Sequence, residues 1–425
     1  MQEGSGAESL PLLAIVYGSL SLEQPLRDLA AAAEGVARIL WVLPFPHKSS
    51  RTAARVARAH GDITGDILDA SAMSPTQAAE ALAAHHPDGI TCFIDETIMW
   101  TAEVADLLGL PFHSPIAAAR LTDKLQQRIA LSEHGLPTPD FWDADDLMAE
   151  AGHAEPRAAD FPLVLKPRRG TSSQDTETLR SMDELRRAVA AHEPGRMLVE
   201  GYIPDPTTPT ADGSAPYVSV EVLVSAGDIS ALGVTGRMPL APPFRETGQY
   251  FPADTTDRAR ASLAEAAVAA VRAIGVTNGV LHVEVKRTDR GPVVIEVNGR
   301  PGGGSTCDFM RRAHDIDLVQ LTMRVALGEH VAYPSLPRPR EVFFRLDVQP
   351  DARLRRITAI EGIDAARRIP GVEQVTVGMN VGDAFSWRNG TFTRVAVVTG
   401  VAPDHAAARS TRAAVLSTIR IHGTK

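Results

Sequence analysis

The sequence lacks several features that mark whole classes of protein. Its 425 residues include only two cysteines, Cys92 and Cys307, which stand far apart and without metal-ligand spacing. This pattern favours a reducing cytoplasm over a compartment with disulfides. No apolar run approaches the ~20 residues that a membrane-spanning helix needs, and residues 1–10 lack the basic start and apolar stretch of a secretory signal. We therefore expect a cytoplasmic protein without a membrane partner.

Familiar cofactor and catalytic motifs are missing as well. The strand-like segment 12–17 is followed by Gly18-Ser19 without the G-x-G-x-x-G series that binds dinucleotides. The sequence has no G-x-x-x-x-G-K-[ST], H-E-x-x-H or G-x-S-x-G, which argues against P-loop NTPases, zinc proteases and serine hydrolases. Its net charge of −9 comes from interspersed acidic and basic residues, so we expect no nucleic-acid partner.

The patterns that are present indicate three units, since the chain is longer than one hydrophobic core supports. Residues 1–120 alternate apolar runs with helical patterns, which predicts a Rossmann-like α/β domain with a parallel sheet. Residues 121–332 are β-rich with intervening helices, an α+β pattern. The proline-rich segment 333–339 indicates a semi-rigid linker. Residues 340–425 then predict a small C-terminal α+β domain.

Individual elements follow from caps, turns and apolar periodicity. Ser74-Pro75 predicts the start of a helix that is expected to run to His85. A basic-faced helix is expected from Leu121 to Gly135. The other expected strands are 12–17, 39–43, 90–94, 163–166, 218–224, 342–348 and 394–398, and the other expected helices are 182–191, 258–273 and 404–418.

The clearest chemical pattern is a β-hairpin over residues 281–298. Two alternating segments flank a four-residue turn at 288–291. If the strands pair symmetrically about residue 290, Glu284 lies opposite Glu296. Two facing carboxylates repel each other unless water or a cation separates them.

The two faces of this hairpin differ in polarity. The apolar positions predict the core face: Leu281, Val283, Val285, Val293, Ile295 and Val297. The opposite face carries His282, Glu284, Lys286, Glu296 and Asn298. Carboxylate and amide oxygens suit Mg²⁺, so the predicted metal ligands are Glu284, Glu296 and Asn298. A solvent-facing hairpin that binds nothing is the alternative, and His282 is interpreted as a local hydrogen-bonding residue.

A glycine-rich turn, Gly299-Arg300-Pro301-Gly302-Gly303-Gly304, follows the hairpin. Its backbone N–H groups can approach an anion closely. The guanidinium of Arg300 is placed for a phosphate or a carboxylate and would stabilise a transferring phosphoryl group. A plain surface turn is the alternative.

The spacing from Glu284 to Glu296-Val297-Asn298-Gly299-Arg300 resembles the metal hairpin of the ATP-grasp superfamily. The segment 121–124 resembles the opening of that domain, which implies that Lys124 contacts ATP phosphate. The strand 161–167 resembles the one with the second nucleotide lysine, and a phosphate loop, 168–175, follows it. Segment 197–203 resembles the hinge that reads adenine. The nucleotide-binding residues implied by this resemblance are Lys124, Lys166, Ser172, Ser173, Glu200, Gly201, Tyr202 and Ile203.

Within the superfamily, the layout of the whole chain resembles the L-amino-acid ligases. This implies an ATP-dependent carboxylate-amine ligase that forms an amide or peptide bond through an acyl phosphate. The strand 218–224 resembles the one whose carboxylate points into the active site, which implies catalytic roles for Glu221 and Arg300. Segment 239–252 is expected to face the substrates. The implied substrate residues are Arg300, Gly303, Gln249 and Arg245.

The implied cofactors are ATP and Mg²⁺, with Mn²⁺ as an alternative, and the implied partners are small-molecule carboxylates and amines. The resemblance also implies a homodimer. Two other readings stay open: a carboxylase-like or purine-pathway ATP-grasp enzyme, and a nucleotide-binding regulator without turnover. The loop 168–175 carries two extra arginines, Arg168 and Arg169, which the regulator reading would accommodate.

Overall fold

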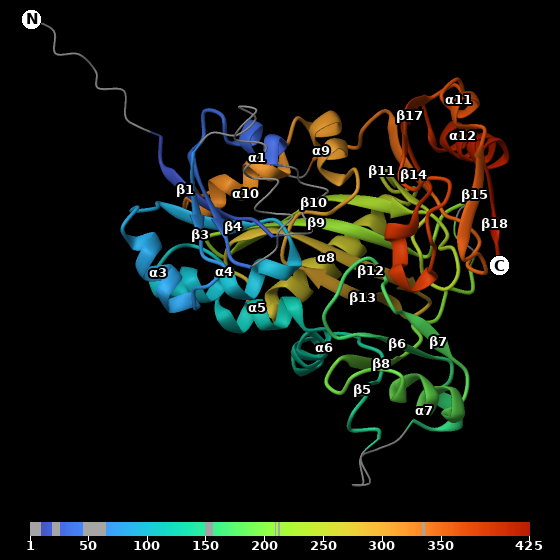
Figure 1. Ribbon diagram of the computed structural model, residues 1–425, viewed down its shortest axis with the longest axis horizontal. Helices are drawn as coiled ribbons and strands as arrows, with labels where there is room; N and C mark the ends of the chain where they lie inside the picture. The colour runs from blue at the N-terminus through green and yellow to red at the C-terminus, as the bar shows by residue number, and fades with distance from the viewer. Residues whose placement is uncertain are drawn as a thin grey trace, which may run out of the picture.

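The computed structural model describes residues 10–18, 26–45, 65–148, 156–208, 210, 213–333 and 336–425. Three segments named in the sequence analysis lie outside these residues. They are residues 1–9, where no secretory signal is expected, Ser19, and Pro334-Ser335 of the expected linker. Figure 1 shows an N-terminal unit in blue on one side, a central sheet, and C-terminal strands in red on the other side.

The N-terminal unit is the predicted parallel α/β sheet. Its strands have the order β3-β2-β1-β4 and are all parallel. The strands are β1 (Leu12–Val16), β2 (Arg38–Leu43), β3 (Asp66–Asp69) and β4 (Gly89–Cys92), and the helices are α1 (Leu26–Ala33), α3 (Pro75–Ala83) and α4 (Asp95–Leu108). The predicted cap of α3 is present, because Ser74 accepts from the backbone of Gln77 and the Gln77 side chain bonds back to Ser74. This helix ends at Ala83, two residues before the expected end.

The helix expected from Leu121 to Gly135 is two helices. α5 (Pro115–Thr122) ends at Asp123, and α6 (Lys124–Glu133) begins there. The extended backbone of Asp123 breaks the helix, and its side chain caps α6 by accepting from the N–H of Leu125. The expected border near residue 120 therefore falls inside α5, and Lys124 stands on the first turn of a new helix.

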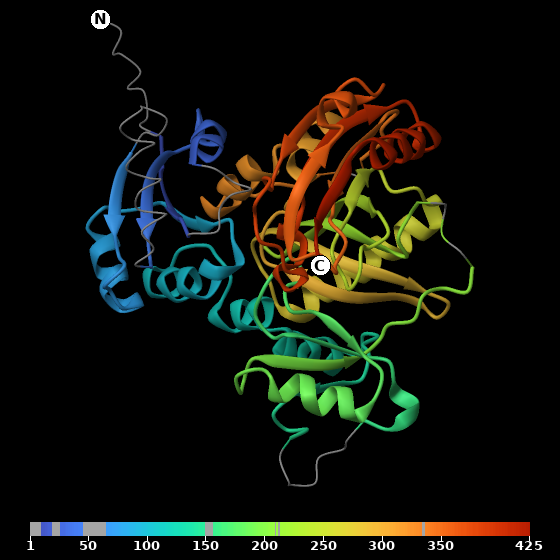
Figure 2. The ribbon, with the colours of Figure 1, turned by 45° about the vertical axis from the view of Figure 1, so that its right-hand side comes forward.

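A small antiparallel sheet follows, drawn at the bottom of Figure 1 and Figure 2. Its strand order is β5-β8-β6-β7. The elements are β5 (Phe141–Asp143), β6 (Leu163–Pro167), β7 (Glu177–Leu179) and β8 (Met197–Gly201), with a short 3₁₀ turn at Ala158–Asp160 and helix α7 (Met182–Ala190). Buried Leu163, Leu165, Leu185 and Val199 hold α7 against the sheet.

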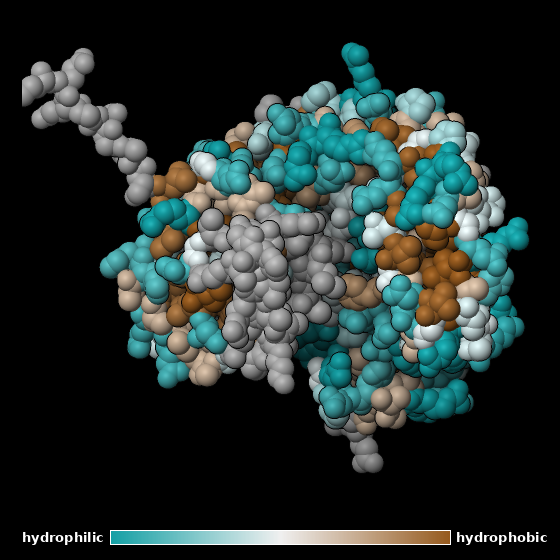
Figure 3. Space-filling model, turned by 45° about the horizontal axis from the view of Figure 1, so that its top comes forward, coloured by the Kyte–Doolittle hydropathy of each residue, from teal (hydrophilic) through white to brown (hydrophobic). Residues whose placement is uncertain are grey.

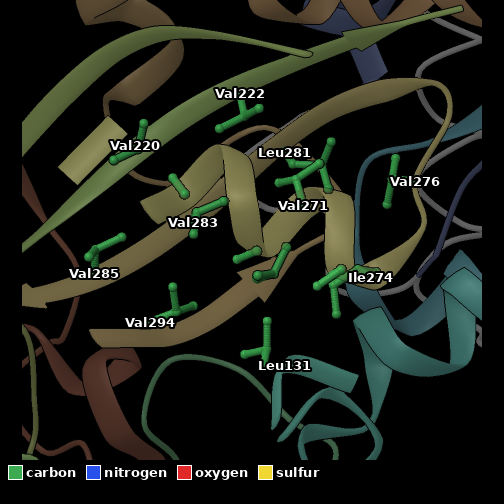
Figure 4. Close-up of a cluster of buried hydrophobic side chains, with 14 of the residues drawn as sticks. Leu131, Val220, Val222, Val271, Ile274, Val276, Leu281, Val283, Val285 and Val294 are labelled. Carbon is green, nitrogen blue, oxygen red and sulfur yellow. The ribbon is translucent and has the colours of Figure 1, made fainter. Parts of the chain in front are cut away.

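The central sheet has eight strands in the order β13-β12-β9-β10-β11-β14-β17-β16. They are β9 (Tyr217–Ser225), β10 (Asp228–Arg237), β11 (Gly248–Phe251), β12 (Gly279–Thr288), β13 (Gly291–Asn298), β14 (Val342–Val348), β16 (Val372–Val377) and β17 (Ala396–Ala402). Helix α8 (Asp257–Ile274) covers one face. Figure 4 shows Val271 and Ile274 of α8 directed at Val222, Leu281 and Val283 of the strands.

The C-terminal unit shares this sheet. β14 pairs with β11, so the strands after the linker extend the sheet of the preceding domain. The unit also contains β15 (Arg356–Glu361), α11 (Ile363–Ala366), a 3₁₀ segment at Trp387–Thr393, α12 (His405–Thr418) and β18 (Arg420–Thr424). The predicted small α+β domain is present with its own apolar cluster. A second cluster is shared with Met238 and Tyr250 of the preceding domain.

Two helices after the glycine turn, α9 (Thr306–His314) and α10 (Leu318–Ala326), connect the units. Val319 and Met323 of α10 pack with Leu13 and Trp41 of the N-terminal sheet. The central chain thus supplies part of the N-terminal core. Charged and polar side chains cover much of the face drawn in Figure 3, and its apolar atoms lie in separate groups. Of the helices that the structure describes, none combines the length and apolarity needed to cross a bilayer.

Candidate functional site

A cavity of about 480 Å³ lies between the small sheet, the central sheet and the C-terminal strands. Most of the predicted site residues line it. These are Lys124, Lys166, Ser172, Ser173, Glu200, Gly201, Tyr202, Ile203, Gln249, Glu284, Glu296, Asn298, Arg300 and Gly303. The structure thus brings together residues that are up to 179 positions apart in the sequence (124 to 303).

The predicted facing of the hairpin carboxylates is confirmed. Glu284 pairs with Glu296, and His282 pairs with Asn298. The rest of the predicted register is wrong near the turn, because strand pairing continues to Thr288 and Gly291 and leaves a two-residue loop. A bulge between the two registers adds one residue on β13 and restores the expected pairing at Glu284.

This bulge corrects the predicted core face. Val294 enters the core at 4% exposure, although Val293 and Ile295 were the residues expected there. Ile295 instead lines the cavity beside Glu296. The extra residue reverses the alternation of side chains on β13, so the cavity gains an apolar wall that a regular strand would not give it.

The two facing carboxylates each have a cationic neighbour. The ammonium of Lys124 lies 2.9 Å from Glu296, and a guanidinium nitrogen of Arg237 lies 3.8 Å from Glu284. Burial raises the pKa of Glu284, and the nearby Arg237 and His282 oppose that rise. The repulsion expected between these carboxylates is therefore offset by basic side chains.

The oxygen donors of Glu284, Glu296 and Asn298 fit a hard divalent cation. All three line the cavity on the same face of the hairpin. Within the described ranges, no three His, Cys, Asp or Glu side chains form a complete metal cage. Two carboxylates and an amide suit Mg²⁺, which keeps water and phosphate oxygens as further ligands.

The carboxylate of Glu200 is held by two buried basic side chains. Arg128 donates to it at 2.8 Å, and Lys166 forms a short ion pair with it. Burial alone would raise the pKa of Glu200, but Arg128 and Lys166 lower it to about 2. Burial lowers the pKa of Lys166, against the effect of Glu200. Glu200 therefore orients Lys166, and residues 201–203 form the adjacent cavity wall.

Lys286 stabilises the hinge segment after β8. Its ammonium donates to the carbonyl of Ile203 at 2.6 Å and pairs with Asp205 at 2.7 Å. It also lies 4.4 Å from the ring centre of Tyr202. All four residues line the cavity. Lys286 was predicted only as part of the polar face, and its hinge contact could not be seen from spacing.

The start of the loop 168–175 is held by ion pairs and a hydrogen bond. Arg168 pairs with Asp123 at 2.7 Å and with Asp143 at 2.9 Å. The Lys124 ammonium donates to the carbonyl of Gly170 at 2.9 Å. One of the two unusual arginines therefore fixes the base of the loop.

Glu221 lies behind the cavity wall and is fully buried. Its carboxylate bonds Nδ1 of His282 and accepts from the N–H of Gly302 at 3.0 Å. A Cβ on Gly302 would lie 2.5 Å from His282 Nδ1, so only glycine fits this approach. The predicted catalytic carboxylate thus fixes the glycine turn from behind.

Arg300 reaches the cavity while paired with the N-terminal unit. Its guanidinium donates twice to one oxygen of Asp95, at 3.0 and 2.7 Å. Asp95 begins α4. The predicted anion-binding arginine is therefore oriented by a residue 205 positions away in the sequence.

The two predicted residues of segment 239–252 differ in placement. Gln249 is buried and lines the cavity. Arg245 lies outside the set of residues that line the cavity, because its guanidinium donates to the carbonyl of Pro242 and sits 5.4 Å from the ring centre of Phe385. Its neighbour Glu246 lines the cavity instead and accepts from Arg237 at 2.9 Å.

Sequence reasoning missed a set of polar residues in the second half of the cavity: Arg237, Arg345, Asp347, Thr391 and Arg394. One signal was visible. Arg345 and Asp347 alternate with apolar residues on the strand 342–348, so they share one face. The sequence does not show that this face lines the same cavity, because that depends on the pairing of β11 with β14.

Two families of known domains match this chain. The ATP-grasp domain (ATP-grasp_3) matches residues 121–304. The L-amino acid ligase C-terminal domain 2 matches residues 356–423. The first range contains the hairpin, both lysines and the glycine turn, and the second contains most of the C-terminal unit.

Two curated proteins are similar to parts of this chain. An uncharacterized protein y4rH of Sinorhizobium fredii is 27% identical over 75% of this chain and 65% of its own length. Human carnosine synthase 1 is 28% identical over 60% of this chain and 32% of its own length. The chain therefore spans less than two thirds of these relatives.

A solved structure shows the same fold over the whole chain. The crystal structure of an L-amino acid ligase from Bacillus licheniformis has a TM-score of 0.72 at 19% identity, covering 98% of this chain and 100% of that one. The chain therefore contains an ATP-grasp domain and an L-amino acid ligase C-terminal domain 2, and it has the fold of this solved ligase.

Proposed function

We propose that this protein is an ATP-dependent carboxylate-amine ligase. It would activate an amino-acid-like carboxylate as an acyl phosphate, join it to an amine and release ADP and phosphate. The observation that carries the proposal is the joint placement of Lys124, the facing Glu284 and Glu296, and Arg300 on one cavity. A phosphate-binding lysine, oxygen ligands for a metal and an anion-binding guanidinium are the parts that phosphoryl transfer to a carboxylate needs.

The nucleotide end would be formed by the small sheet and the hairpin. Lys166, oriented by Glu200, and Lys124, at the start of α6, supply positive charge for phosphates. The backbone of 201–203 and the side chain of Ile295 supply the polar edge and apolar wall for adenine. This division supports ATP as the nucleotide, since a purine needs both a flat apolar surface and backbone partners.

Glu284, Glu296 and Asn298 would hold Mg²⁺, with Mn²⁺ as an alternative. The bound cation would neutralise phosphate charge that lysines alone leave uncompensated. Lys124 and Arg237 lie beside these carboxylates. Lys124 would add its positive charge to the same phosphate-binding end of the cavity.

The reacting carboxylate would lie beside Arg300 and the turn 302–304. Asp95 orients the guanidinium, and Glu221 anchors the N–H of Gly302. The contact with Asp95 fixes the direction of the guanidinium before substrate binds, and the contact with Glu221 fixes the backbone of the turn. A donor held in place in advance is the condition for stabilising charge that develops in the transition state.

Acyl phosphates hydrolyse when water reaches them, so the cavity must be covered during the reaction. The loop 168–175 lies over the nucleotide end, and its residues 170–174 line the cavity. Backbone hydrogen bonds join it to the C-terminal unit at Ser172 and Asp175. These contacts support a closed state in which water is excluded.

Measuring ADP release tests the proposal. The purified protein is incubated with ATP, Mg²⁺, hydroxylamine and each of a panel of amino acids, and hydroxamate is measured alongside ADP. We expect one or a few acids to give equal amounts of ADP and hydroxamate. ADP without any hydroxamate, dependent on bicarbonate, would instead favour the carboxylase-like enzyme. The absence of ADP with every acid would overturn catalysis and favour a regulator.

We also propose a homodimer, as the resemblance to the ligase subgroup implies. Light scattering on the eluting protein would give twice the mass of 45.4 kDa. A monomeric mass at micromolar concentration would contradict it.

A further inference from the structure

The strand that carries two of the proposed metal ligands lies at the edge of the central sheet. Among the described strands, β13 pairs only with β12. In an antiparallel strand, the backbone N–H and C=O groups of every second residue point away from the paired strand. On β13, those of Val297 point outward, between the two ligands Glu296 and Asn298. These outward groups need partners from outside the sheet.

The side chain of Gln127 supplies both partners of Val297. Its oxygen accepts from the N–H of Val297 at 2.8 Å, and its nitrogen donates to the carbonyl oxygen of the same residue at 2.9 Å. The amide thus makes the two hydrogen bonds that a neighbouring strand would make. Gln127 is 2% exposed, so bulk water does not compete for these bonds.

The contacts of Gln127 allow only one orientation of its amide. The side-chain nitrogen also donates to the carbonyl oxygen of Arg120 at 3.1 Å. Turning the amide over would place its N–H groups against the N–H of Val297 and its oxygen against two carbonyl oxygens. A glutamate has no donor for these carbonyls when it is ionised. The position therefore requires an amide.

Two further side chains continue this arrangement along the same edge. Arg128 donates to the carbonyl oxygen of Ile295 at 2.7 Å. Nε2 of His113 lies 3.0 Å from the carbonyl oxygen of Gly299. Ile295, Val297 and Gly299 alternate along the chain, so a side chain from outside the sheet meets each outward carbonyl in this stretch. Side chains thus take the place of a missing strand beside the metal ligands.

Helix α6 joins this edge to the proposed cation site. Lys124 and Gln127 are three residues apart on α6, so they share one face of the helix. Lys124 pairs with the carboxylate of Glu296 at 2.9 Å, and Gln127 bonds the backbone of the next residue. Leu131 of α6 belongs to the apolar cluster of the sheet (Figure 4). The helix therefore contacts β13 through a charged, a polar and an apolar side chain.

We propose that Gln127 is a positioning residue for the proposed cation site. It holds the backbone of Val297 from outside the sheet, which fixes the flanking Glu296 and Asn298 where they line the cavity. Gln127 itself lies outside the set of residues that line the cavity. This role rests on the ligase function and metal assignment proposed above. Residues that orient metal ligands act on metal affinity without touching the metal.

The test measures metal binding directly, with Mn²⁺ as the probe in the presence of ADP. Gln127→Met keeps the length of the side chain and removes its hydrogen bonds. Electron paramagnetic resonance of free Mn²⁺ should show a Kd raised roughly 10- to 100-fold. In the ADP-release assay, the Mg²⁺ concentration for half-maximal rate should rise by a similar factor. The kcat at saturating Mg²⁺ should stay within about twofold of wild type.

Hydrogen exchange gives a readout that needs neither metal nor turnover. The N–H of Val297 is buried and bonded to Gln127, so it should exchange slowly in the metal-free wild type. Mass spectrometry of the peptide that contains residues 291–298 should show this amide hydrogen exchanging rapidly in Gln127→Met. Unchanged protection of that peptide would show that Gln127 does not hold the strand.

Gln320→Met is the matched control. Gln320 is a partly buried glutamine of α10 that donates to the backbone carbonyl of Ala32 at 3.3 Å. Its substitution should leave the Kd of Mn²⁺ and the exchange of the hairpin unchanged. Thermal unfolding compares the stability of the two variants. If Gln127→Met does not fold, Gln127→Asn is measured in its place, with the same expected result, because its shorter amide cannot reach both groups of Val297.

The remaining outcomes separate this role from the proposed function. If Mn²⁺ with ADP binds equally well to wild type and Glu296→Gln, or does not bind to wild type, the metal assignment itself fails. If Glu296→Gln loses Mn²⁺ but folded Gln127→Met keeps the wild-type Kd, only the role of Gln127 is overturned. A lower kcat at saturating Mg²⁺ with unchanged Mn²⁺ binding would also contradict it, because Gln127 would then not act through the cation.

Discussion

Thr391 of the C-terminal unit donates its backbone N–H to the carbonyl oxygen of Ser172 at 2.9 Å. Its hydroxyl accepts from the N–H of Glu246 at 3.0 Å. A single residue therefore joins the loop over the nucleotide end to the segment beside the substrate end. This gives the C-terminal unit a role in closing the cavity in addition to forming part of its wall.

Gly390→Ala should disturb this closure. Gly390 has a φ of 61° and a ψ of −142°, and a Cβ there would lie 2.0 Å from the carbonyl oxygen of Ser172. The loop must shift away, which admits water to the acyl phosphate. We expect roughly 10- to 100-fold lower kcat/KM for ATP and more ADP than amide product.

Gly382→Ala is the control for this change, since Gly382 also has a positive φ, of 97°, but has open space around its Cβ position. If alanine at a positive φ strains the backbone at both positions, thermal unfolding of Gly382→Ala should show the same loss of stability. Equal ADP and product in Gly390→Ala would show that the contact at Ser172 does not exclude water.

Glu296→Gln should abolish turnover and leave the fold intact. The amide removes a negative charge that Lys124 and the proposed cation both need. The ion pair is partly exposed, so its loss should cost no more than about 1 kcal/mol of stability. ADP release and thermal unfolding together measure this, with Glu361→Gln as an exposed control. Near-normal turnover in Glu296→Gln would count strongly against the metal assignment.

The Glu200 ion pairs should make the fold sensitive to acid. The pKa of Glu200 is lowered from 4.5 to about 2 in the folded protein, so its contribution to stability is present above pH ~4.5 and is lost as the pH falls toward 2. Glu200→Gln should cost about 3–5 kcal/mol at pH 7, since it leaves buried charges unpaired.

Urea unfolding at pH 7, 5 and 3.5 checks this sign. The stability difference between wild type and Glu200→Gln should be constant from pH 7 to 5 and should shrink at pH 3.5. Glu80→Gln, at an exposed helix position, provides the baseline. A difference that grows as the pH falls would show that the pKa of Glu200 is raised on folding.

How much of this site was predictable depends on whether its contacts are local. The facing of Glu284 and Glu296 followed from alternation along one hairpin, and the cap at Ser74 followed from adjacent residues. The bulge at Ile295 could not be predicted from the sequence. The apolar residues of β13 are compatible with either register, and the observed one depends on packing against α8 in the folded protein.

Contacts between distant segments were the least predictable part. Nothing near Arg300 in the sequence indicates Asp95 as its partner, and nothing near Arg345 indicates that β14 joins β11. Arg245 illustrates the converse case. A basic residue in an expected substrate loop was assigned to the ligand, although local packing on Phe385 directs it elsewhere. Charge and loop position alone do not reveal which way a long side chain is directed.

Glu221→Gln should distinguish a role in positioning the glycine turn from a role in binding the nucleotide. The carboxylate holds both His282 and the N–H of Gly302 through two oxygens, whereas glutamine offers only one acceptor. The glycine turn should lose its fixed position relative to Arg300. We expect kcat to fall roughly 10- to 100-fold, while KM for ATP stays within about twofold because the nucleotide contacts lie elsewhere.

Ser219→Ala provides the matched control, as this buried residue lies two positions away on the same strand and its hydroxyl makes no hydrogen bond within the described part of the chain. It should retain the wild-type kcat. If Glu221→Gln instead raised KM for ATP and left kcat unchanged, Glu221 would act on the nucleotide site, and the turn would not depend on it. The split between kcat and KM therefore decides whether this buried carboxylate works through Gly302.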